Sequence, residues 1–438
     1  MHPGDSPARE HGLRAALGRF FAPVPLMGWL LAVLTAVLLE RHIGDALIDA
    51  LGLPKIPVLF GVLVMLKKPA LIPGSLAFTG LVYLIPVTLV ARFTAPLTNG
   101  IAAALQRMPL MVSGLIHLGL LYLIFHLWTD VSDYRLITLK LMLIAVLVTL
   151  SINLINGYMG EFSCSHPGFM ALGAYMASIF TVGLFTDDRL FGDAVFHTLL
   201  APAFFPLGLF LGGCVAALGA LIVAVPSFRT RGDYLAIISL AFMFIVKSLL
   251  ENLEFAGGPR GLSGQPDWAT LPAVFCVVVL GVWIMNNFVT STMGKALNAV
   301  RDNESAAEAM TVDTRKTKMI CFMFGAFWAG VAGGLFAHVL RYVAPATFGL
   351  TKLAEVLAMV YFGGLNSVWG SITGAVSISL LSEALRPLQI LKWICIPLLL
   401  ILVMIYRPRG IMAFKEFNPR KILAPRTGKA KGGTDAAA

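Results

Sequence analysis

Long apolar runs alternate with short polar intervals along most of this chain. Several runs approach the roughly 20 residues that a helix needs to cross a bilayer. The pattern predicts an all-α polytopic integral membrane protein with about ten to twelve membrane-crossing helices, some of them short or broken. The predicted crossings are 26–39 (with an extension toward 51), 71–90, 110–128, 136–155, 168–185, 199–225, 235–250, 271–289, 319–340, 368–385 and 390–406.

Two apolar runs are too short to cross a bilayer alone. The run at 56–66 lies between prolines and two lysines and predicts an interfacial or re-entrant piece. The run at 353–362 precedes the glycine-containing stretch 363–367, so it is either the first arm of a hairpin, formed as a half-helix, or part of one long tilted helix reaching 385. Counting crossings back from a basic tail on the cytoplasmic side favours the hairpin.

The composition agrees with a membrane protein. Of the 438 residues, 58% are hydrophobic and 13% charged, whereas a soluble domain carries about 25% charged residues. The net charge of +10 does not indicate nucleic-acid binding, because Lys and Arg gather in loops and termini as in cytoplasmic segments of membrane proteins. Both termini are therefore expected in the cytoplasm. The five cysteines show no paired spacing of metal ligands, so we expect no metal site.

The longest strongly charged interval between two apolar blocks, residues 293–318, has features of a folded element. Ala296, Leu297, Val300, Ala307 and Met310 recur roughly at helical spacing. The sequence from Ser305 to Glu308 fits a capping box. An amphipathic helix lying on a membrane face needs a surface against which to dock, although a solvated loop with incidental helicity remains an alternative. We call residues 293–318 the coupling segment, for the reason given below.

A second interruption, within NLINGYMGEFSCSHPGFMALGAY at 153–175, places three glycines within twelve residues (157–168), together with several polar residues, in an otherwise apolar helix. Irregular backbone at membrane depth must be buried in protein or line a cavity, and broken helices often form substrate sites in transporters. The alternative is an ordinary cytoplasmic turn between two crossings.

Several motifs occur together in a fixed order. They are the 153–175 sequence, RGDYLA at 231–236, GKALNAVRDNESAAEAM at 294–310, the GG…WG pattern at 363–370 and RPRG at 407–410. Together they resemble the M-type permease subunit of bacterial high-affinity branched-chain amino acid (Liv-type) ABC importers. The resemblance covers roughly 136–411, and the region up to 128 fits longer versions of this permease without a specific motif. Three positions depart from the family pattern: Thr311 replaces a usual Gly, Glu161 replaces an uncharged residue, and Ala256 replaces a Thr.

Charge and composition, which indicate the two tails, and the resemblance, which covers the permease domain, together imply a domain organisation; the resemblance also implies a set of partners. The chain divides into a cytoplasmic tail (1–25), an additional N-terminal transmembrane region (26–128), an ABC permease transmembrane domain (129–411) and a cytoplasmic, disordered tail (412–438). The implied setting is the bacterial inner membrane. The implied partners are a second (H-type) permease subunit, two ATP-binding subunits and a periplasmic substrate-binding protein. ATP and Mg would bind to the partners, and no cofactor to this chain.

The resemblance also implies roles for individual residues. A coupling helix near 296–310 would contact the ATP-binding subunit, and a charged, solvated edge suits such a repeatedly remade interface. The loop at 254–262 would lie near the docking surface of the binding protein. The candidates are Arg301, Asp302, Asn303, Glu304 and Glu308 for ATPase coupling; Asn153, Glu161, Ser163, His166, Gly363 and Gly364 for the translocation pathway; and Gly257, Gly258 and Pro259 for binding-protein docking.

The chain contains no phosphate-binding loop. Such a loop needs Gly-Lys followed by Ser or Thr, and both Gly-Lys pairs here are followed by Ala. We therefore expect a transport subunit that is not itself an ATPase. The alternatives are an ion-coupled secondary transporter, an integral membrane enzyme, or a permease of the same family for urea, short amides or aromatic acids. The ionisable candidates for ion coupling are Glu161, His166, His338, Glu355 and Glu383.

Overall fold

The computed structural model describes residues 20–51, 72–185, 201–228, 234–386, 390–406, 410–412 and 417–426. The short piece predicted at 56–66 and residues 231–233 of the RGDYLA motif lie outside these ranges. The chain forms two compact units: unit 1 comprises residues 1–132 and 418–438, and unit 2 comprises residues 133–417.

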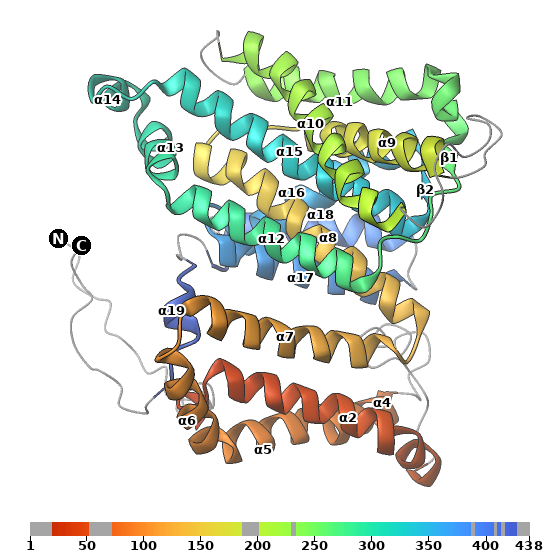
Figure 1. Cartoon of the computed structure of the whole chain (residues 1–438), viewed down its shortest axis with the longest axis vertical. Helices are drawn as coiled ribbons and strands as arrows, with labels where there is room; N and C mark the ends of the chain where they lie inside the picture. Colours follow the sequence, from red (N-terminus) through yellow and green to blue (C-terminus); the bar gives the residue numbers. More distant parts are fainter. Residues whose placement is uncertain are drawn as a thin grey trace. The chain divides into compact units, whose positions relative to one another are not determined.

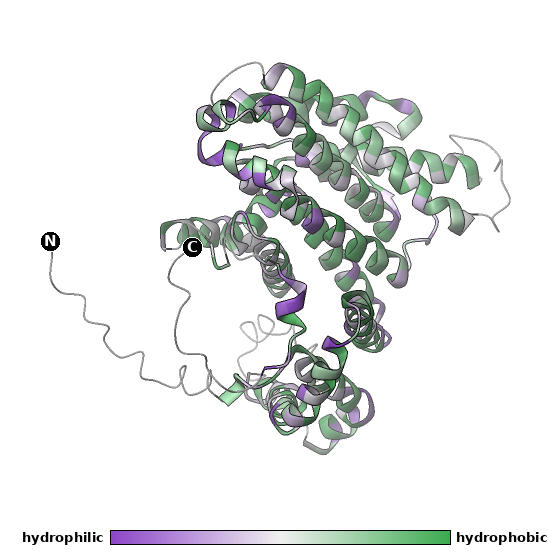
Figure 2. Ribbon diagram, turned by 60° about the vertical axis from the view of Figure 1, so that its left-hand side comes forward, coloured by the Kyte–Doolittle hydropathy of each residue, from purple (hydrophilic) through white to green (hydrophobic). Residues whose placement is uncertain are grey.

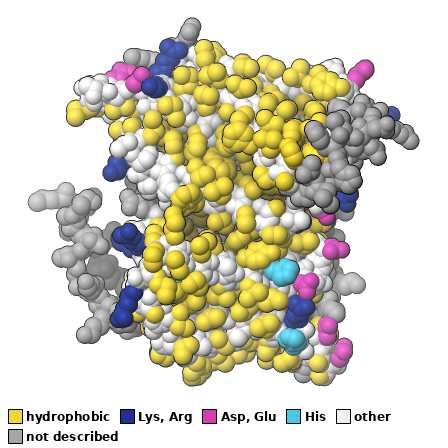
Figure 3. Space-filling model, viewed as in Figure 1, with side chains coloured by type: hydrophobic (Ala, Val, Ile, Leu, Met, Phe, Trp, Pro, Cys, Tyr) yellow, Lys and Arg dark blue, Asp and Glu magenta, His cyan; other side chains and the backbone are white. Residues whose placement is uncertain are grey.

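The structure confirms an all-α polytopic membrane protein. Within the described ranges, nine helices are long and apolar enough to cross a membrane. The only sheet in these ranges pairs two strands of two residues each, β1 (Leu262–Ser263) and β2 (Tyr342–Val343). Hydrophobic residues dominate the helical ribbons in Figure 2. Figure 3 shows hydrophobic side chains over most of the visible surface, with charged side chains toward its left and right margins.

Unit 1 is built mainly from the N-terminal helices. Small residues of α2 and α5 form its core, where Ala32 and Ala91 are fully buried beside Val24 and Ala95. The elements of unit 1 are α2 (Leu26–Leu51), α4 (Ile72–Thr79), the π-helix η2 (Gly80–Leu84), α5 (Ile85–Phe93), α6 (Ala95–Gln106), α7 (Leu110–Thr129) and α19 (Pro419–Ile422).

The C-terminal segment differs from the predicted disordered tail. Asn418 begins α19, since its Oδ1 accepts hydrogen bonds from the backbone N–H groups of Arg420 and Lys421. Further along, the backbone N–H of Arg426 donates to Asn99 Oδ1 at 2.8 Å. Composition alone predicted disorder because it contains no information about these side-chain acceptors, which fix residues 418–426 within unit 1.

Unit 2 contains the remaining helices, drawn from yellow to blue in Figure 1. Its most buried helix is α15, which packs against α8, α9 and α10. The elements in order are α8 (Asp133–Asn153), the π-helix η3 (Leu154–Met159), α9 (His166–Phe185), α10 (Ala201–Ser227), α11 (Tyr234–Asn252), the 3-10 turns η4 (Glu254–Ala256) and η5 (Gly258–Arg260), β1, α12 (Leu271–Thr290), α13 (Thr292–Asp302), α14 (Glu304–Ala309), α15 (Thr314–Leu340), β2, the 3-10 turn η6 (Pro345–Phe348), α16 (Leu350–Gly363), α17 (Val368–Ala384) and α18 (Ile390–Tyr406).

Close helix packing in this core depends on small residues. A Cβ atom added at Gly173 of α9 would lie 2.1 Å from the carbonyl oxygen of Gly330 in α15, so neither backbone could retreat without opening the interface. Helices inside a membrane gain little from excluding water, and small residues allow the backbone approach that gives van der Waals contact.

The hairpin predicted at the C-terminal end is confirmed. Helix α16 ends at Gly363, and α17 begins at Val368 after the connection 364–367, which we call the second break. Gly363 and Gly370 face each other across the hairpin, since a Cβ at Gly363 would lie 1.9 Å from the Gly370 carbonyl oxygen. With 14 and 17 residues, α16 and α17 are both shorter than an ordinary membrane crossing.

Candidate functional site

The coupling segment begins with the amphipathic helix α13. Ser291 caps this helix, because its side-chain oxygen accepts a hydrogen bond from the backbone N–H of Gly294 at 3.4 Å. Leu297 and Val300 are buried, as their helical spacing predicted. Lys295 and Asp302 are exposed on the other side of α13, while its apolar stripe holds the helix against the rest of unit 2.

The predicted single coupling helix is in fact two helices. The backbone is extended at Asn303 (φ −160°, ψ 103°), which separates α13 from α14. Asn303 Oδ1 accepts from the backbone N–H of Ala306 at 3.0 Å, so Asn303 is the N-cap of α14 and the predicted capping box at Ser305 is wrong. Glu308, the other half of that box, instead accepts a hydrogen bond from Thr314 Oγ1 at 3.1 Å. Asparagine competes strongly for N-cap positions, and here it starts the helix earlier than predicted.

Helix α14 ends in a Schellman motif. The backbone N–H of Val312 donates to the carbonyl oxygen of Ala307 at 3.1 Å, and that of Thr311 donates to Glu308 at 3.0 Å. Thr311 adopts a left-handed conformation with φ of 68°, which glycine adopts easily and a β-branched residue rarely does. The departure from the family's glycine at this position therefore leaves the turn intact but strained.

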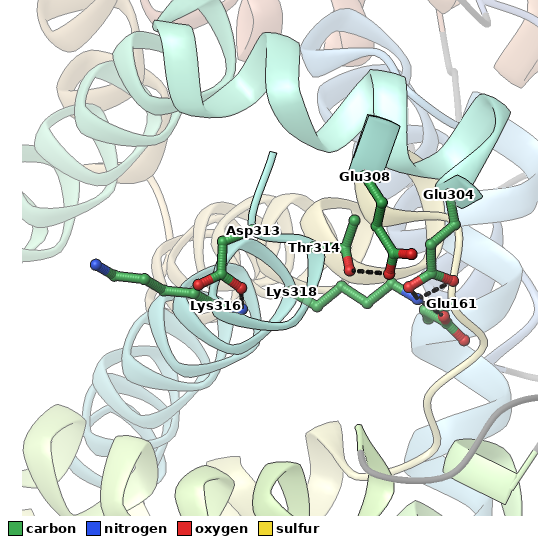
Figure 4. Close-up of polar contacts among 7 residues, drawn as sticks. All are labelled: Glu161, Glu304, Glu308, Asp313, Thr314, Lys316 and Lys318. Atoms are coloured by element: carbon green, nitrogen blue, oxygen red, sulfur yellow. Dashed lines mark hydrogen bonds and ion pairs between the residues drawn. The ribbon is translucent and has the colours of Figure 1, made fainter. Parts of the chain in front are cut away.

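A charged cluster connects the coupling segment to the rest of unit 2. Lys318, in α15, places Nζ 2.8 Å from Glu161 Oε1 and 2.9 Å from Glu304 Oε1 (Figure 4). The Lys318 side chain is only 10% exposed, and the Glu161 and Glu304 side chains are 26% and 46% exposed. We call these three residues the charge triad. It joins α14, α15 and the chain just after the π-helix η3.

Arg301 makes a second connection to the same region. Its Nη1 donates to the carbonyl oxygen of Gly157 at 3.3 Å, while Nε and Nη2 donate to Asp302 Oδ1. Gly160 has φ of 79°, and a Cβ added there would lie 2.3 Å from Cγ of Arg301. The arginine side chain therefore lies directly across the backbone that follows η3, and only glycine leaves room for it.

The interruption predicted in the 153–175 sequence is an irregular segment, residues 154–165, which we call the first break. It is buried except at residues 160–162, where Gly160 and Phe162 are exposed. Helix α8 changes into the π-helix η3, in which every residue is buried, and Gly160 ends it. Beyond it, the Asn156 and Ser239 side chains accept hydrogen bonds from the backbone N–H groups of Ser163 and Cys164 at 3.2 and 2.8 Å. Burial raises the pKa of the Cys164 thiol. The polar side chains thus satisfy backbone groups that helix geometry leaves unpaired.

Asn153 connects the first break to the second. Its Nδ2 donates to Ser371 Oγ at 2.7 Å and to the Ser367 carbonyl oxygen at 3.0 Å, and its Oδ1 accepts from the backbone N–H of Asn366 at 3.1 Å. The side chain is fully buried. The two breaks also approach each other closely at Gly157 of the π-helix. A Cβ added there would lie 2.6 Å from the backbone nitrogen of Asn366.

Residues 410–412 also hold the end of α16, whereas residues 407–409 of the RPRG motif lie outside the described ranges. Backbone N–H groups of Ile411 and Met412 donate to the carbonyl oxygens of Phe362 and Gly363 at 3.2 and 2.8 Å. Gly410 has φ of 80° and lies against Gly364, whose Cα would be 2.5 Å from a Cβ at Gly410. The two residues that follow the RPRG motif therefore supply hydrogen-bond donors to the orphan carbonyls at a helix C-terminus.

The remaining predicted residues lie in other surroundings. His166 is fully buried at the start of α9, with its ring 5.9 Å from the ring of Phe169. The predicted docking loop lies beside β1 and β2, at the end of unit 2 opposite α13 and α14 (Figure 1). In that loop Gly257 and Gly258 adopt positive φ, and Pro259 is exposed while Gly258 is buried.

The residues considered for ion coupling are mostly paired. His338 lies between Thr181 Oγ1 and the Gly334 carbonyl oxygen at 2.9 and 2.7 Å. Glu383 accepts hydrogen bonds from Tyr134 and, at 2.9 Å, from Arg386. In the described part of the chain, no group of three or more His, Cys, Asp or Glu side chains is arranged to hold a metal ion.

Comparison with known proteins places this geometry in context. A family described as "Branched-chain amino acid transport system / permease component" matches residues 134–406. The high-affinity branched-chain amino acid transport system permease protein LivM of Escherichia coli (strain K12) is 29% identical over 327 residues, covering 67% of this chain and 72% of that protein. The probable permease protein LivM of Methanocaldococcus jannaschii is 23% identical over 319 residues, covering 61% of this chain and 90% of that protein. No solved structure matches.

Sequence reasoning missed three parts of the site. From the sequence, Lys318 is only one of several charged residues of the coupling segment, and nothing in its spacing indicates Glu161 as its partner. The contact between Arg301 and Gly157 joins residues far apart in the chain, so no local pattern predicts it. The RPRG motif was noted as a resemblance, but the contact of the two residues after it with the end of α16 follows only from the backbone hydrogen bonds.

Proposed function

Because the chain belongs to the family of permease components of branched-chain amino acid transport systems, we propose that it forms half of the substrate pathway of an ATP-driven importer. A second permease subunit of the H type would form the other half. Two ATP-binding subunits would supply the energy and hold ATP and Mg, and a periplasmic binding protein would deliver the substrate. The chain would lie in a bacterial inner membrane with both termini in the cytoplasm.

The observation that carries this proposal is the exposed edge of α14 and its anchoring. Residues 302–306 and 308–310 are exposed, whereas Ala307 between them is buried. Asp302, Asn303, Glu304 and Glu308 therefore face solvent on a folded element, as a polar docking surface for an ATP-binding subunit would require. Met310, 77% exposed beside them, offers an apolar contact to the same partner.

Two contacts give the coupling segment a route to the pathway. Arg301 donates a hydrogen bond to the Gly157 carbonyl oxygen of η3, and Lys318 forms an ion pair with Glu161, the residue after Gly160. Asn153 then connects the same π-helix to the second break. A push on α14 by the ATP-binding subunit would thus move the first break and, through Asn153, the end of α16. Coupling needs such a contiguous set of elements with two arrangements.

We propose branched-chain amino acids as the substrates, since the relatives carry that designation. Uptake of labelled leucine would be measured in cells with and without this chain, with isoleucine, urea, acetamide and benzoate as competitors. We expect uptake to require the chain and to be inhibited by isoleucine alone. Uptake that is independent of the chain contradicts the amino acid assignment, and inhibition by urea, acetamide or benzoate points to that cargo instead.

The coupling role has its own test. Charge reversal at Arg301 and Glu304 is expected to abolish uptake while the protein remains folded in the membrane. Arg420→Glu, a reversal at an exposed residue of α19, serves as the matched control. Normal uptake by the Arg301 and Glu304 variants would exclude coupling through this edge.

A further inference from the structure

A cavity of about 170 Å³ lies within unit 2, between α8, α16 and α17. Met142, Val148 and Met359 contribute apolar wall, as does Phe336 of α15. The cavity involves the first turns of α16 and the last turns of α17, so it lies toward the end of unit 2 opposite the coupling segment (Figure 1). The coupling contacts described above lie outside it.

The size of the cavity suits a small organic group. An apolar cavity of about 150 Å³ is sufficient to bind benzene. The isobutyl or sec-butyl side chain of an aliphatic amino acid is no larger than that, so it can occupy the apolar part while the polar end of the molecule remains at the rim. Urea, which has no apolar part, would leave the methionine and phenylalanine surfaces uncovered.

The polar residues at the rim carry opposite charges. Lys352 Nζ and Glu355 Oε2 are 3.1 Å apart on neighbouring turns of α16, with side chains 19% and 22% exposed. Lys352 Nζ also lies 5.2 Å from the ring centre of Phe336. A third charge, Glu383, is bound to Arg386 and Tyr134. Their pairing offsets part of the cost of desolvating two charges beside an apolar cavity, and it holds a cation and an anion side by side at the rim.

We propose that this cavity is a subsite for a zwitterionic amino acid with an apolar side chain, in which Lys352 binds the carboxylate and Glu355 the ammonium group. This inference rests on the proposed transport function and extends it to named residues. A free amino acid carries its carboxylate and its ammonium group on the same carbon atom, so the two groups match a cation and an anion held side by side. A monocarboxylate such as benzoate would satisfy Lys352 and leave Glu355 facing a second anion.

The first experiment compares variants of the complete importer in liposomes. Lys352→Met and Glu355→Gln should each reduce leucine uptake at low substrate concentration at least about tenfold, the effect of losing one charge-assisted hydrogen bond. Lys247→Met is the matched control, because Lys247 forms a similar pair with Glu251 (3.8 Å) on α11 but does not line the cavity. Equal uptake by the variants and the wild type would overturn the assignment.

A second experiment tests binding directly. Ser379 lines the cavity and is partly exposed, so Ser379→Cys introduces a thiol for a maleimide, with the wild-type chain reporting the background from its own cysteines. Leucine should slow the labelling, whereas 4-methylpentanoate, which lacks the ammonium group, and isopentylamine, which lacks the carboxylate, should not. Equal effects of all three, or none, would overturn the zwitterion subsite.

The two experiments separate this inference from the function on which it rests. A wild-type importer that transports no amino acid would refute both. If the wild-type importer transports leucine, while the cavity variants are unaffected and leucine does not protect the Ser379→Cys variant from labelling, the subsite alone is refuted.

Discussion

The charge triad predicts a specific pattern of stability among variants. Lys318→Met removes the shared cation and leaves the Glu161 and Glu304 carboxylates facing each other. Both oxygens lie within 2.9 Å of the same Nζ, so they are at most about 6 Å apart. At an effective dielectric constant near 20, two unit charges about 6 Å apart repel each other by about 3 kcal/mol, and solvent around the half-exposed Glu304 side chain reduces this value. With the screened repulsion and the lost hydrogen bonds taken together, we expect Lys318→Met to lower the free energy of unfolding by about 3 kcal/mol.

The single carboxylate variants should differ from each other. Glu304→Gln should lower the free energy of unfolding by at most about 1 kcal/mol, because the Glu304 side chain is half exposed and solvent screens its ion pair with Lys318. Glu161→Gln should cost more, about 1–2 kcal/mol, because its pair with Lys318 is better shielded. The double variant Lys318→Met with Glu161→Gln should be more stable than the sum of its parts predicts.

The assay is a double-mutant cycle on the purified protein. Reversible unfolding would be followed in mixed micelles as the fraction of dodecyl sulfate increases, and the same variants would be tested for ATP hydrolysis and uptake in the assembled importer. We expect an interaction energy between Lys318 and Glu161 of about 1.5–3 kcal/mol. We also expect ATP hydrolysis to continue in Lys318→Met while uptake falls. Additive effects of the two substitutions would refute the triad as a connecting element.

Three further variants test the neighbouring geometry. Thr311→Gly should stabilise α14 by about 1 kcal/mol because it relieves the left-handed conformation; hydrogen exchange at the Val312 amide should slow about fivefold, and Thr311→Ala should not reproduce the effect. Gly160→Ala should destabilise the protein by about 1–3 kcal/mol because its Cβ meets Arg301 at a positive φ; unfolding that matches the wild type would contradict this. Asn153→Ala should cost about 2–3 kcal/mol and reduce uptake, since buried backbone groups lose their partners; Asn252→Ala, which loses one exposed bond, is the control.

The sequence predicted the parts of the fold that depend on local patterns. Long apolar runs correspond to the nine long helices of the described residues, because a helix in lipid must satisfy its backbone internally and be apolar over its whole length. The glycine-containing stretch at 363–367 predicted the hairpin of α16 and α17, since glycine ends helices readily. The order of motifs in the 134–406 region identified the family.

The parts that could not be predicted depend on tertiary contacts. The capping box at Ser305 was a valid local pattern, but Asn303 is an equally good N-cap, and sequence alone does not rank the two. The partnership of Lys318 with Glu161 depends on the path of the first break, which leaves helical geometry. The placement of residues 418–426 depends on acceptors supplied by Asn418 and Asn99.

The irregular elements of unit 2 meet at one end for a physical reason. The π-helix η3, the end of α16 and the separation of α13 from α14 all occur where the charge triad, Arg301 and Asn153 connect them. A regular helix transmits force but has one stable geometry, whereas a π-helix or a broken helix can rearrange its hydrogen bonds at small cost. A permease must alternate between two pathway states while its long helices stay packed. Placing the irregular backbone between a solvent-facing helix and the short hairpin confines that rearrangement to the segment that we propose as the contact for an ATP-binding subunit.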